Sequence, residues 1–281
     1  MVSIWTSTTR LIFSSGVYMD QFYVICVYVI AGILGLCVGS FLNVVIYRLP
    51  RELSLAFPGS HCTRCDYQLK WYDNIPVLSW IMLKGKCRKC GEPISVRYTV
   101  VELANMVMWL LSVLLFWVTS PVYAVISAIV CSTMICIFFI DLEHMLIYNR
   151  FVLIVAAAGI VAMFHDGYTK PADHVIGALV GGGLFALLYF GAIWVLKREA
   201  MGFGDVKFAA AIGLLLGWQK FLFAVLIASV VGSIVLVLLN RINNQERTTE
   251  YPFGPFLVGG SLVSMFIGAP LITWYVALII G

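Results

Sequence analysis

Charged residues are scarce in this chain. Only 11% of its 281 residues are Asp, Glu, Lys or Arg, whereas 62% are hydrophobic, and the mean hydropathy is +0.98. This balance excludes an ordinary soluble domain. The sequence also lacks a recognisable RNA- or DNA-binding motif, so the net charge of +4 does not indicate a nucleic-acid partner.

Several other signals are missing. No G-x-S-x-G string is present, which argues against a serine hydrolase, and no H-E-x-x-H string is present, which argues against a zincin-type protease. Residues 1–21 carry one Arg, a short apolar patch and no clear small-residue cleavage site, so they do not predict a signal peptide. The chain shows no internal repeat and no lipidation signal.

Long apolar runs are abundant, and a membrane-spanning helix needs about 20 such residues. The runs are 22–47, 99–119, 122–140, 151–164, 175–196, 206–218, 221–239 and 254–280. The sequence therefore predicts an all-α polytopic membrane protein with about eight transmembrane helices. Two runs, 151–164 and 206–218, are short, which predicts tilt, partial insertion or a nearby water-filled cavity.

The basic residues predict the orientation. With the N-terminus outside, 15 of the 18 Lys and Arg residues fall on the inside, as the positive-inside rule requires. We therefore expect an external segment at 1–21, a first span at 22–47, a cytosolic segment at 48–97 and the remaining spans in 98–281.

The cytosolic segment contains two cysteine pairs. Cys62 and Cys65 form one C-x2-C unit, Cys87 and Cys90 form the other, and 21 residues separate the pairs. Four thiolates at this spacing suit a closed, structural zinc site. Two disulfides are the alternative, but thiols stay reduced in the cytosol, which favours zinc. The remaining cysteines lie in apolar runs and are expected to be small packing residues.

Two aspartates stand out at the ends of apolar runs. Asp205 lies in Gly202-Phe203-Gly204-Asp205-Val206-Lys207, before residues 208–218, and Asp141 follows residues 122–140. Either Asp alone could simply cap or border a helix. Two acids on the same side of the membrane indicate a site, because hydrocarbon does not solvate a carboxylate.

Two carboxylates held close together do not both ionise cheaply and are expected to share a proton. The ionised member can take a proton from water, and the protonated one can polarise a peptide carbonyl. The pair therefore predicts aspartyl hydrolysis at the membrane edge. The residues Gly202 and Gly204 would leave space for a substrate, and Lys207 is either an interfacial cation or a group that keeps one carboxylate ionised.

Other polar residues near the spans have expected roles that are structural or that stay undecided between two contacts. Asn43 is expected to form an interhelical hydrogen bond, and Glu102 either pairs with Arg97 or lines a cavity. Glu143 and His144 are expected to be solvated residues at the membrane boundary. The polar residues on the outer side, which are not expected to form a metal site, are His165, Asp166, Asp173 and His174.

Five ordered motifs over residues 30–260 resemble the prepilin peptidases, also called type IV leader peptidases. They are residues 39–50, the cysteine pairs framing 73–76, residues 140–144, residues 202–207 and residues 252–256. The resemblance implies a GxGD-type aspartyl protease of the bacterial inner membrane, with a periplasmic N-terminus and with 98–281 as its protease domain. It also implies Asp141 and Asp205 as catalytic residues, supported by Glu143, and the four cysteines as zinc ligands.

The resemblance further implies the reaction and its partners. Such enzymes remove a basic leader from type IV prepilins or type II secretion pseudopilins, whose apolar stems lie in the membrane lipid. They commonly also methylate the new N-terminus with S-adenosylmethionine, whose binding residues the sequence does not identify. The sequence also does not decide whether the chain forms a homodimer. One departure is visible, because Ile147-Tyr148-Asn149 stands where the family usually has Leu-Pro-Asp.

Two other functions remain alternatives. A proton-coupled transporter would use the Asp pair as a relay, but it would need acids distributed through the membrane depth, whereas here they gather near one edge. A non-enzymatic assembly factor would use the zinc segment to dock partners. Cleavage of a synthetic prepilin would separate both from the peptidase.

Overall fold

The computed structural model describes residues 21–165, 169–197, 201–243 and 251–280. The predicted external segment at 1–21 therefore lies almost wholly outside the described residues. The long helices are α2 (Gln21–Arg48), α4 (Arg97–Phe116), α5 (Pro121–His144), α6 (Asn149–His165), α7 (Pro171–Leu196), α8 (Phe203–Leu216), α9 (Trp218–Asn243) and α10 (Gly254–Ile280). Between α2 and α4 come only η1 (Leu49–Arg51), η2 (Trp71–Asn74) and the short α3 (Leu78–Met82).

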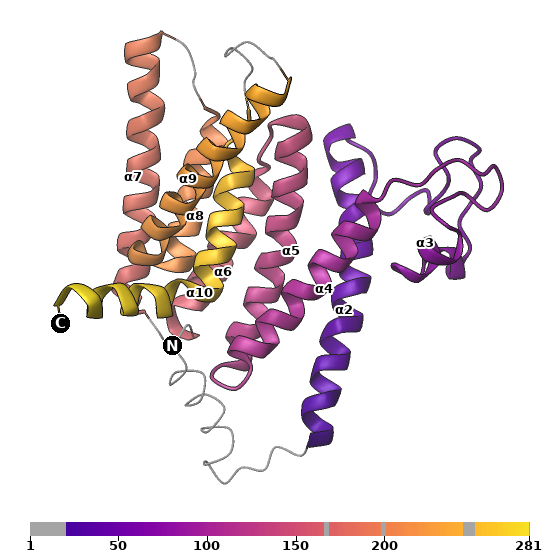
Figure 1. Ribbon diagram of the computed structural model, residues 1–281, viewed down its shortest axis with the longest axis horizontal. Coiled ribbons are helices and arrows are strands. Elements are labelled where there is room, and N and C mark those ends of the chain that lie inside the picture. Colours follow the sequence, from indigo (N-terminus) through magenta and orange to yellow (C-terminus); the bar gives the residue numbers. More distant parts are fainter. Residues whose placement is uncertain (1–20, 166–168, 198–200, 244–250, 281) are drawn as a thin grey trace.

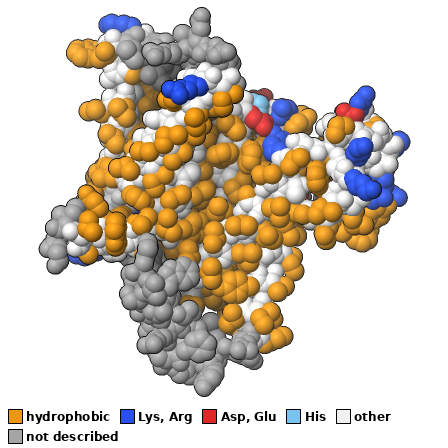
Figure 2. All heavy atoms as spheres, in the orientation of Figure 1, with side chains coloured by type: hydrophobic (Ala, Val, Ile, Leu, Met, Phe, Trp, Pro, Cys, Tyr) orange, Lys and Arg blue, Asp and Glu red, His pale blue; other side chains and the backbone are white. Residues whose placement is uncertain are grey.

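Each predicted apolar run forms one helix of this bundle, and within the described ranges six helices are long and apolar enough to cross a membrane. The other two, α6 and α8, have 17 and 14 residues and correspond to the two short runs. Large apolar side chains cover the outside of the bundle (Figure 2), as lipid contact requires. The prediction of an all-α polytopic membrane protein is confirmed.

Two boundaries differ from the predicted ones in a way that matters for the site. Helix α5 continues to His144 rather than ending near residue 140, so Asp141 lies inside its last turn. Helix α8 begins at Phe203 rather than at 206, so Asp205 lies inside its first turn. Hydropathy alone ended the α5 run too early and began the α8 run too late, because it counts an acidic residue as the end of an apolar run even where that residue belongs to the helix.

The helices pack in close pairs, with α5 at the centre of the bundle (Figure 1). Over its most apolar 18 residues α5 is 72% buried, compared with 17% for α2. Helix α2 lies mainly against α4, α7 against α8, and α9 against α10. The segment between α2 and α4 projects from one end of the bundle and carries a concentration of Lys and Arg side chains (Figures 1 and 2).

Glycines allow two of these pairs to approach closely. A Cβ atom on Gly39 would lie 2.8 Å from the Cα atom of Glu102, so α2 contacts α4 backbone to backbone. On α7, a Cβ atom on Gly177 would overlap the carbonyl oxygen of Gly213 in α8. Small residues at four-residue spacing permit this kind of contact in membrane helices, so these glycines serve helix packing.

Buried polar side chains join α2, α4 and α5. Asn43 in α2 donates from its side-chain amide to the carbonyl oxygen of Tyr98 in α4, at 3.0 Å. Asn105 in α4 donates to the carbonyl oxygen of Gly35 at 2.7 Å and accepts from the hydroxyl of Ser132 in α5 at 2.8 Å. Such bonds between membrane helices contribute roughly 0.6–2 kcal/mol each. The predicted interhelical role of Asn43 is therefore confirmed.

Candidate functional site

The two predicted aspartates lie at the same end of the bundle. Asp141 is in the last turn of α5 and is 5% exposed, and Asp205 is in the first turn of α8. Their carboxyl groups are close enough to interact electrostatically. Residues 64 positions apart in the chain are thus brought together by the packing of the helices.

At the start of α8, one oxygen of the Asp205 carboxylate has no hydrogen-bond partner among the described residues. Gly202 precedes the helix in an extended conformation (φ −73°, ψ 144°), and its backbone is within hydrogen-bonding reach of the Asp205 carboxylate. Oδ1 of Asp205 is buried and has no hydrogen-bond partner among the described residues. This oxygen is available to a water molecule or to a substrate group.

A third element, the start of α10, contacts Asp141. The backbone of Gly254, the first residue of α10, lies within hydrogen-bonding reach of the Asp141 carboxylate. A Cβ atom on Gly254 would overlap Oδ2 of Asp141, so any larger residue there would displace the acid. Gly254 belongs to the motif at residues 252–256, and that motif gave no indication of this contact. Its contact with Asp141 depends on residues 113 positions apart and has no signal in the local pattern.

The segment that departs from the family pattern packs along the start of α8. A Cβ atom on Gly204 would lie 3.2 Å from Cβ of Ile147, so the missing side chain lets this loop sit against the helix. The Lys207 ammonium donates to Oδ1 of Asn149 at 3.1 Å. Lys207 therefore binds an amide where the usual family residue would offer a carboxylate.

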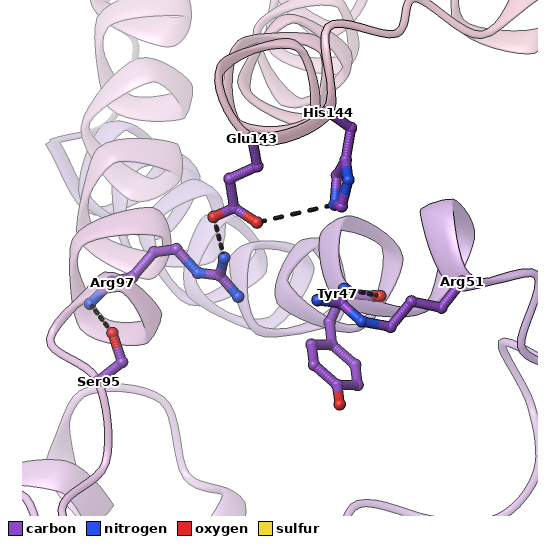
Figure 3. A network of polar contacts seen from close by, with 6 residues as sticks. All are labelled: Tyr47, Arg51, Ser95, Arg97, Glu143 and His144. Atoms are coloured by element: carbon purple, nitrogen blue, oxygen red, sulfur yellow. Dashed lines mark hydrogen bonds and ion pairs between the residues drawn. The ribbon is translucent and has the colours of Figure 1, made fainter.

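Glu143 forms an ion pair with Arg97, the first residue of α4 (Figure 3). The Glu143 side chain is 34% exposed, and its other oxygen lies 4.0 Å from Nε2 of His144. Glu143 is exposed, as expected of a residue at the membrane boundary, and it also pairs with Arg97, which the sequence did not predict. The pairing was not predictable because it joins two helices whose relative position depends on the whole bundle.

Of the two roles predicted for Glu102, pairing with Arg97 or lining a cavity, the structure shows the second. Its side chain is buried in α4, and Oε2 accepts a hydrogen bond of 2.7 Å from the backbone N–H of Val77. Val77 has a positive φ of 62°, which is unusual for a β-branched residue. The contact fixes the loop before α3 onto a membrane helix, and the same carboxylate lines a cavity between them.

The four predicted zinc ligands form one cluster. Their sulfur atoms all lie within 4.8 Å of one another, with Cys62 and Cys90 3.8 Å apart and Cys65 and Cys87 4.0 Å apart. A tetrahedral site with zinc–sulfur bonds of about 2.3 Å has sulfur–sulfur edges of about 3.8 Å. A disulfide needs about 2.05 Å, and all four cysteines are free thiols. The donor set and its spacing therefore fit a tetrahedral metal ion.

Each cysteine pair sits on a tight knuckle with the same backbone pattern. The amide of Cys62 donates to Tyr67 and that of Cys87 donates to Glu92, both across a five-residue separation. One residue after each pair, Asp66 (φ 51°) and Gly91 (φ 71°) adopt the left-handed conformation. Gly91 provides this conformation without strain, and Asp is among the residues that tolerate it.

Asp73 holds the two knuckles to the rest of the segment. It is buried and accepts hydrogen bonds from Arg88 at 2.8 Å and from the hydroxyl of Tyr67 at 3.1 Å. Burial opposes ionisation of this carboxyl group, but the bonds from Arg88 and Tyr67 outweigh burial and lower its pKa. The small segment is thus stabilised by a polar core as well as by its cysteine cluster.

The polar residues on the other side of the bundle have structural partners. His174 is fully buried and contacts the carbonyl oxygen of Leu214 at 2.8 Å and the hydroxyl of Thr169 at 2.5 Å. Asp173 caps α7 and accepts from the indole of Trp218 at 3.1 Å. Asp166 lies outside the described residues.

Two family models match the chain. Residues 33–116 match the bacterial peptidase A24 N-terminal domain, and residues 128–237 match the type IV leader peptidase family. The first region covers most of α2, the cysteine segment and α4, and the second covers α6 to α8 with most of α5 and α9.

Similar proteins occur in several bacteria. The chain is 34% identical to the prepilin leader peptidase/N-methyltransferase of Aeromonas salmonicida, over 87% of this chain and 92% of that protein. It is 40% identical to the Myxococcus xanthus protein of the same name, over 79% and 67% of the two chains. It is 37% identical to a type 4 prepilin-like proteins leader peptide-processing enzyme of Escherichia coli, over 86% and 94%.

No solved structure matches this fold. The family models cover 194 of the 281 residues, 84 in the first and 110 in the second, and the matches cover 92% of the Aeromonas salmonicida protein and 94% of the Escherichia coli protein. The chain belongs to the type IV leader peptidase family.

Proposed function

We propose that Asp141 and Asp205 cleave the leader from type IV prepilins or related pseudopilins, and that the same chain methylates the new N-terminus. Support for the cleavage site comes mainly from the convergence of these two acids from α5 and α8, next to the free Oδ1 of Asp205. The names of the relatives support both reactions.

In the cleavage step the ionised carboxylate removes a proton from a water molecule, which attacks the carbonyl carbon of the scissile peptide. The protonated carboxyl group donates its proton as the carbonyl oxygen gains charge. The backbone of Gly254 orients Asp141, and the backbone of Gly202 orients Asp205. The leaving amine takes a proton and becomes the new N-terminus.

The substrate is a chain with an apolar stem and a basic leader. The stem suits the lipid-facing apolar surface beside the bundle, and the leader suits an end of the bundle that carries Asp141, Asp205 and Glu143. This arrangement favours a protein of the bacterial inner membrane. Its N-terminus would lie in the periplasm, and the site and the cysteine segment would face the cytosol.

The cysteine segment rests on lipid at that same surface. Trp71 and Met82 are 80% and 78% exposed, and neighbouring apolar side chains of α3 are also exposed. A small domain rarely exposes such residues together unless they contact a partner or a membrane. The four thiolates hold a structural zinc ion, which leaves no open coordination position for catalysis.

S-adenosylmethionine is the expected methyl donor. When bound, it supplies an electrophilic methyl group on a positively charged sulfur. The residues of this chain must then bind that cation, orient the amine and exclude water from the reaction.

A synthetic prepilin tests the cleavage site. Asp141→Asn and Asp205→Asn are each expected to lower the cleavage rate by at least about 100-fold, the lower range for loss of a general acid or base. Asp66→Asn is the matched control, because this exposed residue has a left-handed conformation that Asn also accepts. Mass spectrometry of the product's N-terminus reports the cleavage position and methylation together.

The alternatives give different results in this assay. A transporter or an assembly factor would leave the prepilin intact in the wild-type reaction. If both Asp→Asn variants cleave as fast as the wild type, the assignment of the catalytic pair is wrong.

A further inference from the structure

A cavity of about 770 Å³ lies between the cysteine segment and the adjoining ends of α2 and α4. Its wall includes Asn43, Trp80, Arg97, Tyr98, Glu102 and, from α5, Glu143. Pockets for small molecules and cofactors are typically about 300–1,000 Å³. The cavity is therefore large enough for a nucleoside-sized ligand.

Glu102 is the unusual group in this wall. It is 8% exposed, and its hydrogen-bond partners are the Val77 amide and the Ser40 side chain, both neutral. Within the described ranges, the ion pairs of Lys, Arg and His go to Asp73, Glu92 and Glu143, and none goes to Glu102. A buried carboxylate without a counter-ion is costly, so this wall suits a cationic ligand.

Other charged groups of the cavity already have partners. The Arg48 guanidinium donates to the carbonyl oxygens of Ser54 and Pro58 at 2.9 and 2.7 Å. Asp73 is bound by Arg88, and Arg97 by the Glu143 carboxylate. These contacts serve the fold. Nε of Arg97 has no hydrogen-bond partner among the described residues, but the charge of Arg97 is paired with Glu143, whereas the Glu102 carboxylate has no ion-pair partner there.

The wall also has unsatisfied neutral groups and aromatic surface. Oδ1 of Asn43 and Oγ1 of Thr99 are buried and have no hydrogen-bond partner among the described residues. Both residues line the cavity, together with Tyr98 and Trp80. Aromatic rings stack on nucleobases, and a ligand with hydroxyl and amino groups could pair with such oxygens after small side-chain adjustments.

We propose that this cavity binds the methyl donor and that the Glu102 carboxylate faces its positively charged sulfonium group. The inference rests on the proposed methylation. The neutral α-amine of the cleaved substrate attacks the methyl carbon, a nitrogen–carbon bond forms, and the sulfur–carbon bond breaks. The electron pair of the broken bond stays on sulfur as a neutral thioether, and the methylated ammonium loses one proton to water.

The charge change makes a specific prediction about affinity. Glu102 attracts the sulfonium donor but not the neutral thioether product, S-adenosylhomocysteine. Sinefungin, which carries an amine in place of the sulfonium, keeps the positive charge. The wild type is expected to bind the two cationic ligands about 10- to 100-fold more tightly than the product, because only a positively charged ligand is attracted to the carboxylate by Coulomb interaction.

The experiment is equilibrium dialysis of the full chain in detergent with radiolabelled S-adenosylmethionine, in competition with unlabelled sinefungin or S-adenosylhomocysteine. Glu102→Gln keeps an acceptor for the Val77 amide but removes the charge, so its preference for cationic ligands should disappear. Glu102→Asp keeps the charge and should keep part of the preference. Glu52→Gln changes an exposed carboxylate outside the cavity and should behave as the wild type.

The outcomes separate this inference from the proposed function. A wild type that binds no donor at all, while cleaving prepilin, would overturn the methylation proposal and this site together. A Glu102→Gln protein with normal zinc content and normal elution that keeps the wild-type preference for cationic ligands would overturn only the site. Loss of that preference in Glu102→Gln, with its partial retention in Glu102→Asp, would support the site.

Discussion

The carboxylate of Asp141 has almost no free space on the side of α10. Gly254 meets it with its backbone, and one added carbon would overlap Oδ2. The orientation of the acid is therefore controlled by a residue that has no side chain. Catalytic geometry is sensitive to such contacts, because a displacement of about 1 Å can cost roughly 100-fold in rate.

Gly254→Ala is expected to lower prepilin cleavage by about 10- to 100-fold, because the new methyl group displaces the Asp141 carboxylate. Gly259→Ala, in the same helix, is the matched control, since a Cβ atom there meets nothing within 4 Å. The measurement is the cleavage rate at equal amounts of folded, zinc-loaded protein. Equal rates for the two variants would show that α10 does not position the acid.

Asn149 gives a second prediction for a single residue. Asn149→Asp would convert the hydrogen bond from Lys207 into an ion pair and restore the carboxylate usual in the family. Exposed pairs contribute roughly 0–1 kcal/mol, so the thermal unfolding midpoint should rise only slightly. Cleavage should persist, and a strong loss of activity would mean that the amide has a role beyond holding Lys207.

At the scale of the helices, hydropathy predicted the existence of all eight long elements. It did not predict that Asp141 and Asp205 lie inside the terminal turns of α5 and α8, because each predicted apolar run stops beside its acidic residue. The local sequence also did not predict three contacts between distant elements. They are Glu143 with Arg97, Gly254 with Asp141, and Glu102 with Val77. Each joins elements far apart in the chain and exists only once the helices have packed.

The cysteine cluster was predictable for a different reason. Metal ligands must come in a fixed number and spacing, so two short C-x2-C units carry their geometry in the sequence. The same is true of the small residues in α7, where a four-residue spacing places Gly177 and Gly181 on one face. Signals that repeat within one or two turns survive in a single sequence, whereas contacts between distant helices do not.

The close approach of α7 and α8 gives a matched pair of substitutions. Gly177→Ala would push a methyl group into the backbone of α8 and should destabilise the bundle by roughly 1–3 kcal/mol. Gly183→Ala, on the same helix, meets nothing within 4 Å and should stabilise it by about 0.5–1 kcal/mol, because glycine disfavours helix. Unfolding in detergent measures both, and equal effects of the two changes would contradict the packing.

At the scale of the whole molecule, the cysteine segment and the membrane bundle are separately stabilised. The segment depends on its cysteine cluster, which fits a metal ion, and on Asp73, whereas the bundle depends on buried apolar surface and interhelical hydrogen bonds. The two parts meet at Glu102 and along the cavity. Loss of the metal should therefore damage one part first.

Chelation of zinc, or Cys62→Ser, is expected to make residues 48–97 sensitive to protease while the helical content of the spans persists. Metal analysis should find about one zinc per chain before treatment and none afterwards. Cys37→Ser, outside the cluster, should keep both the metal and the protease resistance. Unchanged protease resistance after complete metal loss would show that the cluster is not needed for the fold of this segment.

Glu143 occupies an unusual position between the two reactions. It follows Asp141, the proposed catalytic acid of α5, by two residues, and it also lines the cavity proposed for the methyl donor. The amine to be methylated does not exist until the leader bond is broken. If the donor binds beside that same helix, a newly cleaved pilin stem would move only a short distance before it is methylated. The proximity of the two sites would then ensure that methylation follows cleavage. The unmethylated intermediate would seldom diffuse away into the bilayer.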